Sequence, residues 1–284
     1  MSVAGPQQDE PRPDIAVVVT ACDYGQFLAE CLRSIDSQTR PPDQLVVVDD
    51  ASMDSTPALL EELLPTLRIG DRVRMHRNSR RLGAAGSLNL ALQHLVDAPL
   101  VANVDADDVV LPRYLQAMAE TLEQHPAAGY AYPRIELFGE ASGIYTTYPF
   151  DPARLIFEGN YIPNVGLLRR AAVLEAGGYR DLPTHVDWDL WLALLEAGHE
   201  GVLVDEVLYR WRRHSAAMSY QPLWRLLAVR AQIQWRHRRL LARYRSSGLR
   251  WTASAAARRS PWRRKQRSAE LRGSAWVDRD AGSS

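Results

Sequence analysis

Two kinds of apolar pattern alternate along the first 110 residues. Short uninterrupted runs of β-branched and aliphatic residues are typical of strands that are buried on both faces of a sheet. Segments with apolar residues three and four positions apart are typical of helices that present one face to a core. The predicted strands cover residues 15–20, 45–48, 73–76 and 100–104, and the predicted helices cover 27–35, 55–67 and 83–96.

Strands that alternate with helices of this length predict an α/β fold, with a mostly parallel sheet and helices on both of its faces. Ligands in such sheets bind beyond the carboxyl ends of the strands. Acidic side chains follow three of the predicted strands, namely Asp23, then Asp49 with Asp50, then Asp105 with Asp107 and Asp108. We therefore expect three acidic clusters to meet at one edge of the sheet.

The pattern is less regular after Pro133. Glycines and prolines in residues 134–160 predict a hairpin and loops. A strand at 162–168, a short helix at 170–176, a helix at 186–196 and one or two short strands at 201–209 complete the predicted body.

Charge divides the chain although the 284 residues sum to zero. Residues 220–284 contain 16 basic and 3 acidic residues, whereas the other 219 contain 18 basic and 31 acidic ones. This asymmetry predicts an acidic catalytic body, residues 14–219, that carries a basic arm, residues 220–284, and follows a flexible leader, residues 1–13. Two cysteines are too few for a disulfide framework or a four-cysteine zinc site.

The sequence Asp-Ala-Asp-Asp at 105–108 directly follows a predicted buried strand. Carboxylates on alternate residues of an extended turn can share a hard divalent cation, and Mg²⁺ or Mn²⁺ prefers such oxygen ligands. The cation would also neutralise a diphosphate leaving group. The alternative is that these aspartates cap a helix that begins near Leu111.

At this point the sequence resembles the family 2 glycosyltransferases, which have the Rossmann-like GT-A fold. The resemblance covers about residues 14–219, with a nucleotide-sugar half at 14–110 and an acceptor half at 111–219. The first half carries it in VVVTACDYGQFLAECLRSIDSQ, LVVVDDASMDST, RRLGAAGSLNLAL and VANVDADDVVLP. The second half carries it in GNYIPNVGLLRRAAVLEAGGYRD, HVDWDLWLALLEAG and VLYRWRRHSAAMS.

The resemblance implies that the nucleotide base lies against the first two strand ends, at Thr20, Ala21, Asp23, Asp49 and Asp50. A carboxylate there can accept from an imide N–H, which favours a UDP or dTDP sugar. Thr20 and Asp23 stand where the family commonly has Pro and Asn. The alternative for Asp49 and Asp50 is a turn that leads into a capped helix.

The diphosphate side follows by the same resemblance. Arg81 would pair with the diphosphate, although a solvated surface arginine is the alternative. Asp105 would contact the ribose or a metal-bound water, and Asp107 would ligate Mn²⁺ or Mg²⁺. His214, in Arg-Trp-Arg-Arg-His, would close over the diphosphate or reach the metal through a neutral imidazole.

The catalytic base implied by the resemblance is Asp187, because inverting members use this aspartate to remove a proton from the acceptor hydroxyl. Val186 stands where the family usually has Glu. Trp188 and Asp189 are candidates for the acceptor side, Asp189 also as a substitute base and Trp188 with core packing as its alternative. For Asp187 the alternative is a helix cap.

The basic arm contains an amphipathic segment, residues 223–244, in which tryptophans and arginines recur at helical spacing. Such a helix suits an anionic membrane surface. The alternative is a helix that docks on the acidic body and is followed by a disordered tail from about Gly248. No signal peptide or membrane-spanning run is apparent, so we expect a cytoplasmic protein that could lie peripherally at the inner face of the membrane.

Together these features predict a metal-assisted, inverting glycosyltransferase. The acceptor is open among lipid-linked, saccharide, protein and small-molecule hydroxyls, and no nucleic acid is expected. Two alternatives are a relative with impaired catalysis that only binds sugar nucleotide or membrane, and a sugar nucleotidyltransferase. The nucleotidyltransferase would be expected to carry a glycine-rich basic loop after the first strand, where residues 21–24 read Ala-Cys-Asp-Tyr.

Overall fold

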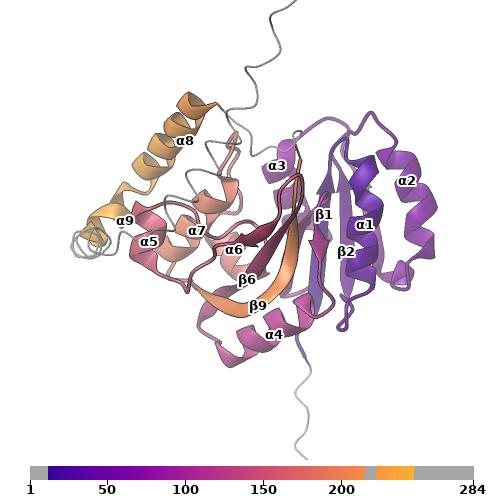
Figure 1. Cartoon of the computed structure of the whole chain (residues 1–284), viewed down its shortest axis with the longest axis horizontal. Helices are drawn as coiled ribbons and strands as arrows, with labels where there is room; N and C mark the ends of the chain where they lie inside the picture. Colours follow the sequence, from indigo (N-terminus) through magenta and orange to yellow (C-terminus); the bar gives the residue numbers. More distant parts are fainter. Residues whose placement is uncertain (1–11, 215–221, 246–284) are drawn as a thin grey trace, which may run out of the picture. The chain divides into compact units, whose positions relative to one another are not determined.

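A computed structural model describes residues 12–214 and 222–245 of the chain. Its centre is a sheet whose first half is parallel, in the order β3-β2-β1-β4, and Figure 1 shows the neighbours β1 and β2. The four predicted strands form, each running slightly further than expected, and all but the edge strand at 73–77 are buried apolar runs. They are β1 (Ile15–Ala21), β2 (Gln44–Asp49), β3 (Val73–Arg77) and β4 (Leu100–Asp105).

The second half of the sheet is mixed. β8 (Leu167–Arg169) pairs antiparallel with β4 and β6 (Ala128–Gly139), whereas β9 (Glu200–Arg213) runs parallel to β6. The two-residue strand β5 (Val109–Val110) closes the order against β9, and β7 (Gly143–Tyr145) forms a hairpin with β6. The predicted α/β fold class is confirmed, with the parallel pairing concentrated at the strands that precede the acidic clusters.

Helices cover both faces of the sheet, as predicted. Alternate residues of β1, such as Val17 and Val19, share a core with α1 (Gly25–Asp36), α2 (Thr56–Leu63) and α4 (Tyr114–Gln124). The intervening residue Val18 instead lies with Leu88 of α3 (Gly83–Leu90) and Val173 of α6 (Arg170–Glu175). Two-residue alternation along one strand therefore supplies both cores.

Two predicted helices are shorter than expected. The helix expected at 55–67 ends as α2 at Leu63, and a 3-10 turn, Leu64–Thr66, follows it. Pro65 lies in this turn, and proline cannot donate the backbone bond that continues an α-helix. The helix expected at 83–96 changes after α3 to a π-helical turn, Ala91–Leu95.

The region after Pro133 differs more from the expectation. Residues 134–139 extend the twelve-residue strand β6, and β9 is one strand of 14 residues instead of one or two short ones. The strand expected at 162–168 begins only at Leu167. In the residues before it, Val165 N donates to Pro163 O at 2.7 Å, a local turn that replaces ladder pairing.

The basic segment forms α8 (Leu223–Arg236) and α9 (Arg238–Arg243), and the described residues up to Leu241 belong to one compact unit. Val229 and Ile233 form the buried face of α8. Arg230 donates to the carbonyl oxygens of Phe157 and Glu158 at the end of α5 (Pro152–Phe157). No helix in residues 12–214 and 222–245 is long and apolar enough to cross a membrane. The predicted leader, apart from residues 12 and 13, and the predicted tail from Gly248 lie outside the described residues.

Candidate functional site

The carboxyl ends of β2, β1 and β4 lie side by side, as the sequence predicted. Ala21 is the register partner of Asp49 in β2, and Thr20 is the partner of Asp105 in β4. Thr20 is half-buried and Ala21 is buried, so both contribute mainly backbone to this edge. The three acidic strand ends therefore converge because parallel strands in register finish at one edge.

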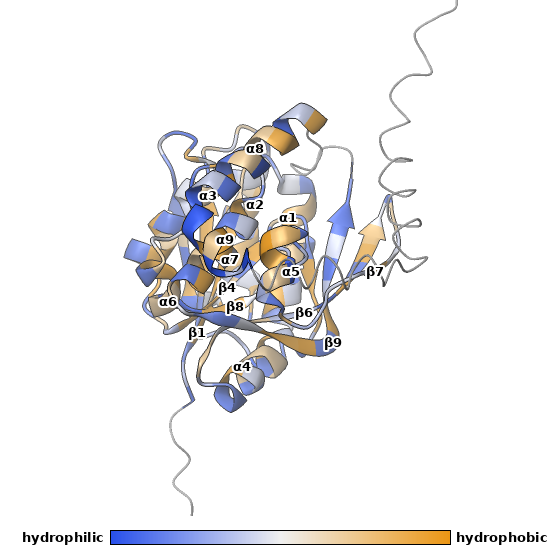
Figure 2. Ribbon diagram, turned by 90° about the vertical axis from the view of Figure 1, so that its left-hand side faces the viewer, coloured by the Kyte–Doolittle hydropathy of each residue, from blue (hydrophilic) through white to orange (hydrophobic). Residues whose placement is uncertain are grey.

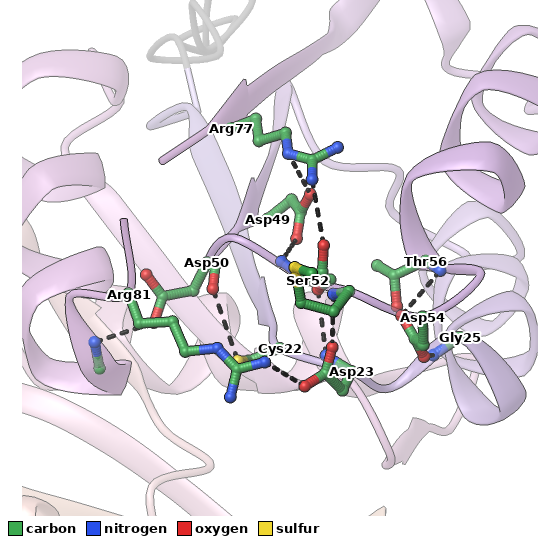
Figure 3. A network of polar contacts seen from close by, with 12 residues as sticks. Cys22, Asp23, Gly25, Asp49, Asp50, Ser52, Asp54, Thr56, Arg77 and Arg81 are labelled. Atoms are coloured by element: carbon green, nitrogen blue, oxygen red, sulfur yellow. Dashed lines mark hydrogen bonds and ion pairs between the residues drawn. The ribbon is translucent and has the colours of Figure 1, made fainter. Parts of the chain in front are cut away.

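Asp49 and Asp50 are buried and hold the loops that surround the strand ends (Figure 3). Asp49 Oδ1 accepts from Ser52 N at 2.9 Å, and its Oδ2 lies 3.3 Å from Arg77 Nε. Asp50 accepts from the backbone N–H groups of Leu82 and Gly83 at 2.7 and 2.8 Å. Asp50 thus fixes the loop that leads into α3. At Gly83 this loop has a φ of +75°, which glycine adopts without steric cost.

Asp23 and Arg81 form an ion pair at the same edge (Figure 3). Asp23 has a left-handed backbone with φ 60°, and its carboxylate accepts from Met53 N at 2.7 Å. This backbone N–H, together with Arg81, holds the pKa of Asp23 below its usual value. Arg81 was predicted beside the diphosphate, and the structure brings it to Asp23, one of the predicted base contacts.

Asp107 and His214 meet although 107 residues separate them in the chain. His214 Nε2 lies 2.8 Å from Asp107 Oδ2, and both side chains are largely buried. The rings of Phe27 and Tyr24 pack against the imidazole, with centroid distances of 4.9 and 6.1 Å. The structure thus brings together two of the residues that were predicted to ligate a metal ion.

Asp108 holds His214 in this position through β9. Its carboxylate accepts from Arg212 N at 2.7 Å and from the Tyr209 hydroxyl at 2.9 Å, and Arg212 Nε donates to the carbonyl of Asp107 at 2.7 Å. Burial raises the pKa of Asp108 well above its usual value. Sequence reasoning missed the roles of Tyr209 and Arg212. The run Arg-Trp-Arg-Arg-His was a signal for Arg212, but its contacts depend on how β9 pairs.

The third predicted metal ligand, Asp105, lies beside Asp107. Burial and the negative charges of Asp107 and Asp187 raise its pKa to about 7. Among the described residues there is no group of three or more side chains arranged to hold a metal ion by themselves. Mg²⁺ and similar cations usually bind one or two protein ligands together with water and substrate phosphates. The Asp107–His214 pair fits that pattern, since a carboxylate and an imidazole are both acceptable ligands.

Asp187 lies in the first turn of α7 (Val186–Glu196), which covers the range predicted for this helix. Asn160 Nδ2 donates to its Oδ2 at 2.6 Å, and Trp188 N donates to its Oδ1 at 2.8 Å. Burial raises the pKa of Asp187 despite these two donors. The N-cap position belongs to His185, whose φ is 58°, and not to Asp187. Asn160 is a third residue that sequence reasoning missed, because it precedes Asp187 by 27 positions.

Trp188 and Asp189, the two candidates for the acceptor side, both lie in packed structure. Trp188 is 1% exposed, and its indole N–H donates to the Leu155 carbonyl at 2.9 Å. Asp189 is completely buried between Arg180 and Arg236, each 2.9 Å away. Both side chains point into packed structure because α7 is buried on nearly every side. Trp188 therefore packs in the core, which was the alternative to a position on the acceptor side.

Comparison with known proteins identifies the class of this fold and site. A model of the family "Glycosyl transferase family 2" matches residues 16–171, which include the strand ends at Thr20, Asp49 and Asp105. The chain belongs to this family.

Three similar proteins illustrate the match. The putative glycosyltransferase EpsE of Bacillus subtilis is 26% identical over 73% of this chain and 76% of its own length. The structure of S. aureus TarS 1-349 with UDP-GlcNAc has a TM-score of 0.63 at 17% identity, covering 82% of this chain and 73% of that one. The mannosyltransferase PcManGT of Pyrobaculum calidifontis, in complex with GDP-Man and Mn²⁺, has a TM-score of 0.57 at 18% identity. This match covers 89% of this chain and 82% of the PcManGT chain. At these identities the two structures establish the GT-A fold.

Proposed function

We propose that this protein transfers a glycosyl group from a nucleoside-diphosphate sugar to an acceptor hydroxyl, with inversion at the anomeric carbon. The observation that carries the proposal is the meeting of the Asp107–His214 pair with Asp105 and Asp187 at one edge of the sheet. Strand ends from the nucleotide half and the start of α7 from the acceptor half supply these groups. A donor and an acceptor can therefore reach one reaction centre.

The nucleotide would bind across the ends of β1 and β2. Asp49 Oδ2 is buried and has the ion pair with Arg77 but no hydrogen bond among the described residues, so it keeps the capacity to accept from a base. A carboxylate accepts a hydrogen bond from an imide N–H, and it repels a ring nitrogen that is itself an acceptor. UDP or dTDP is the favoured donor on this ground, and the UDP-GlcNAc named for TarS is compatible with it.

Asp107 and His214 would hold a divalent cation, Mn²⁺ or Mg²⁺, with Asp105 beside them. When bound, that cation supplies charge neutralisation for the diphosphate leaving group. Asp108 and Arg212 keep the two ligands together by tying the end of β9 to the loop after β4. The complex of PcManGT with Mn²⁺ supports divalent-cation use in a protein of this fold.

Asp187 would act as the general base. Asn160 and Trp188 N donate to its two oxygens, which orients the carboxylate and favours its ionised form. Burial opposes ionisation and so makes the carboxylate a stronger base than an exposed aspartate. The acceptor O–H would give its proton to Asp187 as its oxygen bonds to the anomeric carbon, while the bond to the diphosphate breaks on the opposite face.

The first test is isothermal titration of the full chain with a panel of nucleoside diphosphates, with and without Mn²⁺. We expect tighter binding of UDP or dTDP when Mn²⁺ is present. Asp107→Ala should lower the Mn²⁺-dependent affinity about tenfold or more, as loss of a metal ligand does. Asp71→Ala, at an exposed aspartate outside the site, is the matched control and should bind like the wild type. An Asp107→Ala protein with the full Mn²⁺ effect contradicts the metal assignment.

A second test separates catalysis from binding once the donor is known. Asp187→Asn should bind the donor normally and lose transfer, and the wild-type product should have the anomeric configuration opposite to that of the donor. Donor binding without turnover in the wild type, across a broad acceptor panel, would favour the alternative of a catalytically impaired relative. The family match favours transfer to an acceptor over nucleotidyl transfer.

A further inference from the structure

Helix α8 exposes an apolar face that none of the described residues covers. Four of the eight large hydrophobic residues that are exposed in the described structure lie on this helix, namely Leu223, Trp224, Leu227 and Trp235. The two tryptophans are 71% and 70% exposed. A helical repeat of about 3.6 residues places all four side chains on one side of α8. Figure 2 shows apolar and polar segments alternating along this helix. We call the surface of these four residues the outer face.

The opposite side of α8 is already in use. Val229 and Ile233 are buried, Arg230 holds the end of α5, and Arg236 reaches the buried Asp189 of α7. Just beyond the end of α8, His237 Nε2 lies 3.3 Å from the same carboxylate. The helix is therefore anchored to the body through one side. Its outer face is exposed without any need for α8 to move.

Charge complementarity indicates what the outer face fits. Residues 222–245 contain seven arginines and no acidic residue. Arg238 lies over the ring of Trp235 with 4.7 Å to its centroid, so a guanidinium and an indole are presented together. Tryptophan and arginine side by side suit the boundary between lipid headgroups and acyl chains, and the arginines favour anionic headgroups.

The outer face is also close to the reaction centre along the chain. Only residues 215–221 separate His214 from Pro222, which precedes α8. Even a fully extended segment of that length spans at most about 30 Å. If α8 binds to a surface, the Asp107–His214 pair therefore stays near that surface.

We propose that the outer face of α8 docks the protein on an anionic lipid surface. Trp224 and Trp235 insert at the headgroup boundary, Leu223 and Leu227 lie beside them on the same face, and the flanking arginines bind phosphate groups. This docking goes beyond the transfer reaction and does not require it. It would present the donor site to acceptors carried on that surface.

The test is sedimentation of the full chain with vesicles of phosphatidylcholine alone or mixed with phosphatidylglycerol. We expect binding to the mixed vesicles and little to the neutral ones. The double variant Trp224→Ser/Trp235→Ser should lower the affinity for the mixed vesicles about tenfold or more. The two large apolar side chains that would be transferred from water into the lipid surface are then missing. The matched control is Met75→Ser/Ile144→Ser, which removes exposed apolar residues from β3 and β7 and should bind like the wild type.

Several outcomes overturn the proposal. Equal binding by the tryptophan variant and the wild type would assign the interaction to the basic residues of 246–284, which number nine, and not to α8. Wild-type binding to neither vesicle, or to both equally, also contradicts it. The proposal is also contradicted if the wild type binds no vesicles and forms a dimer in light scattering, and the tryptophan variant is a monomer. Nucleotide titration of the same variants shows whether the donor site is intact, so failure of docking is distinct from failure of the proposed function.

Discussion

Replacing Asp189 with asparagine removes the negative charge on which the contact between α7 and α8 converges. The carboxylate is completely buried, with Arg180 and Arg236 each 2.9 Å away and His237 at 3.3 Å. Burial alone would raise the pKa of Asp189, but the hydrogen bonds from His237, Arg180 and Arg236 outweigh it and lower the pKa to about 2. An amide in the same place keeps the shape of the side chain and loses this charge.

The lowered pKa sets the size and the pH dependence of the effect. The difference between 3.8 and about 2 corresponds to about 2 kcal/mol of folding stability. The folded form binds the proton less readily than the unfolded chain, so this stability is complete above about pH 5. It falls to about half at pH 3 and disappears below about pH 2.

Urea unfolding followed by tryptophan fluorescence measures this effect at pH 7 and pH 3. With a slope of about 2–3 kcal/mol per molar urea, Asp189→Asn should lower the midpoint by about 1 M at pH 7 and by about half as much at pH 3. Asp205→Asn is the control, because Asp205 is 74% exposed and pairs with Arg134 at the surface, where an ion pair contributes little. A midpoint difference that is absent, or equally large at both pH values, would refute the assignment of Asp189 as an ionised anchor of α8.

Two further predictions concern the strand ends and the base. The acid limb of kcat/KM should lie above the usual aspartate pKa, because burial raises the pKa of Asp187 and transfer requires its ionised form. Asn160→Ala should move that limb to still higher pH, since the amide favours the ionised carboxylate, and a pH–rate profile in which the limb stays or moves down would argue against this role. Asp50→Asn should lower the free energy of unfolding by about 1–3 kcal/mol, because an amide nitrogen cannot accept from Leu82 N or Gly83 N. Chemical denaturation checks this value, and wild-type stability would mean that Asp50 does not hold the loop before α3.

Local pattern was sufficient for the first half of the fold. Uninterrupted apolar runs predicted β1, β2 and β4, because a strand that is buried on both faces has mostly apolar residues along its whole length. The rule that parallel strands bind ligands at their carboxyl ends then placed Asp49, Asp50 and Asp105 at one edge, which the register of β1 confirms. The helix α7 was predicted with its observed bounds, Val186–Glu196.

Long-range pairing decided the rest. β6 and β9 contain proline and charged residues that break the local pattern, and they become long strands because they pair with each other along most of their length. The pairing of β9 with β5, together with the hydrogen bond from Arg212 N to Asp108, brings His214 to Asp107, a contact that the sequence reached only by resemblance. The orientation of α7 could not be read from its composition. A helix that is apolar on most sides gives no periodic signal for which polar residue faces inward, so only packing showed that Asp189 is buried among arginines while Asp187 meets Asn160.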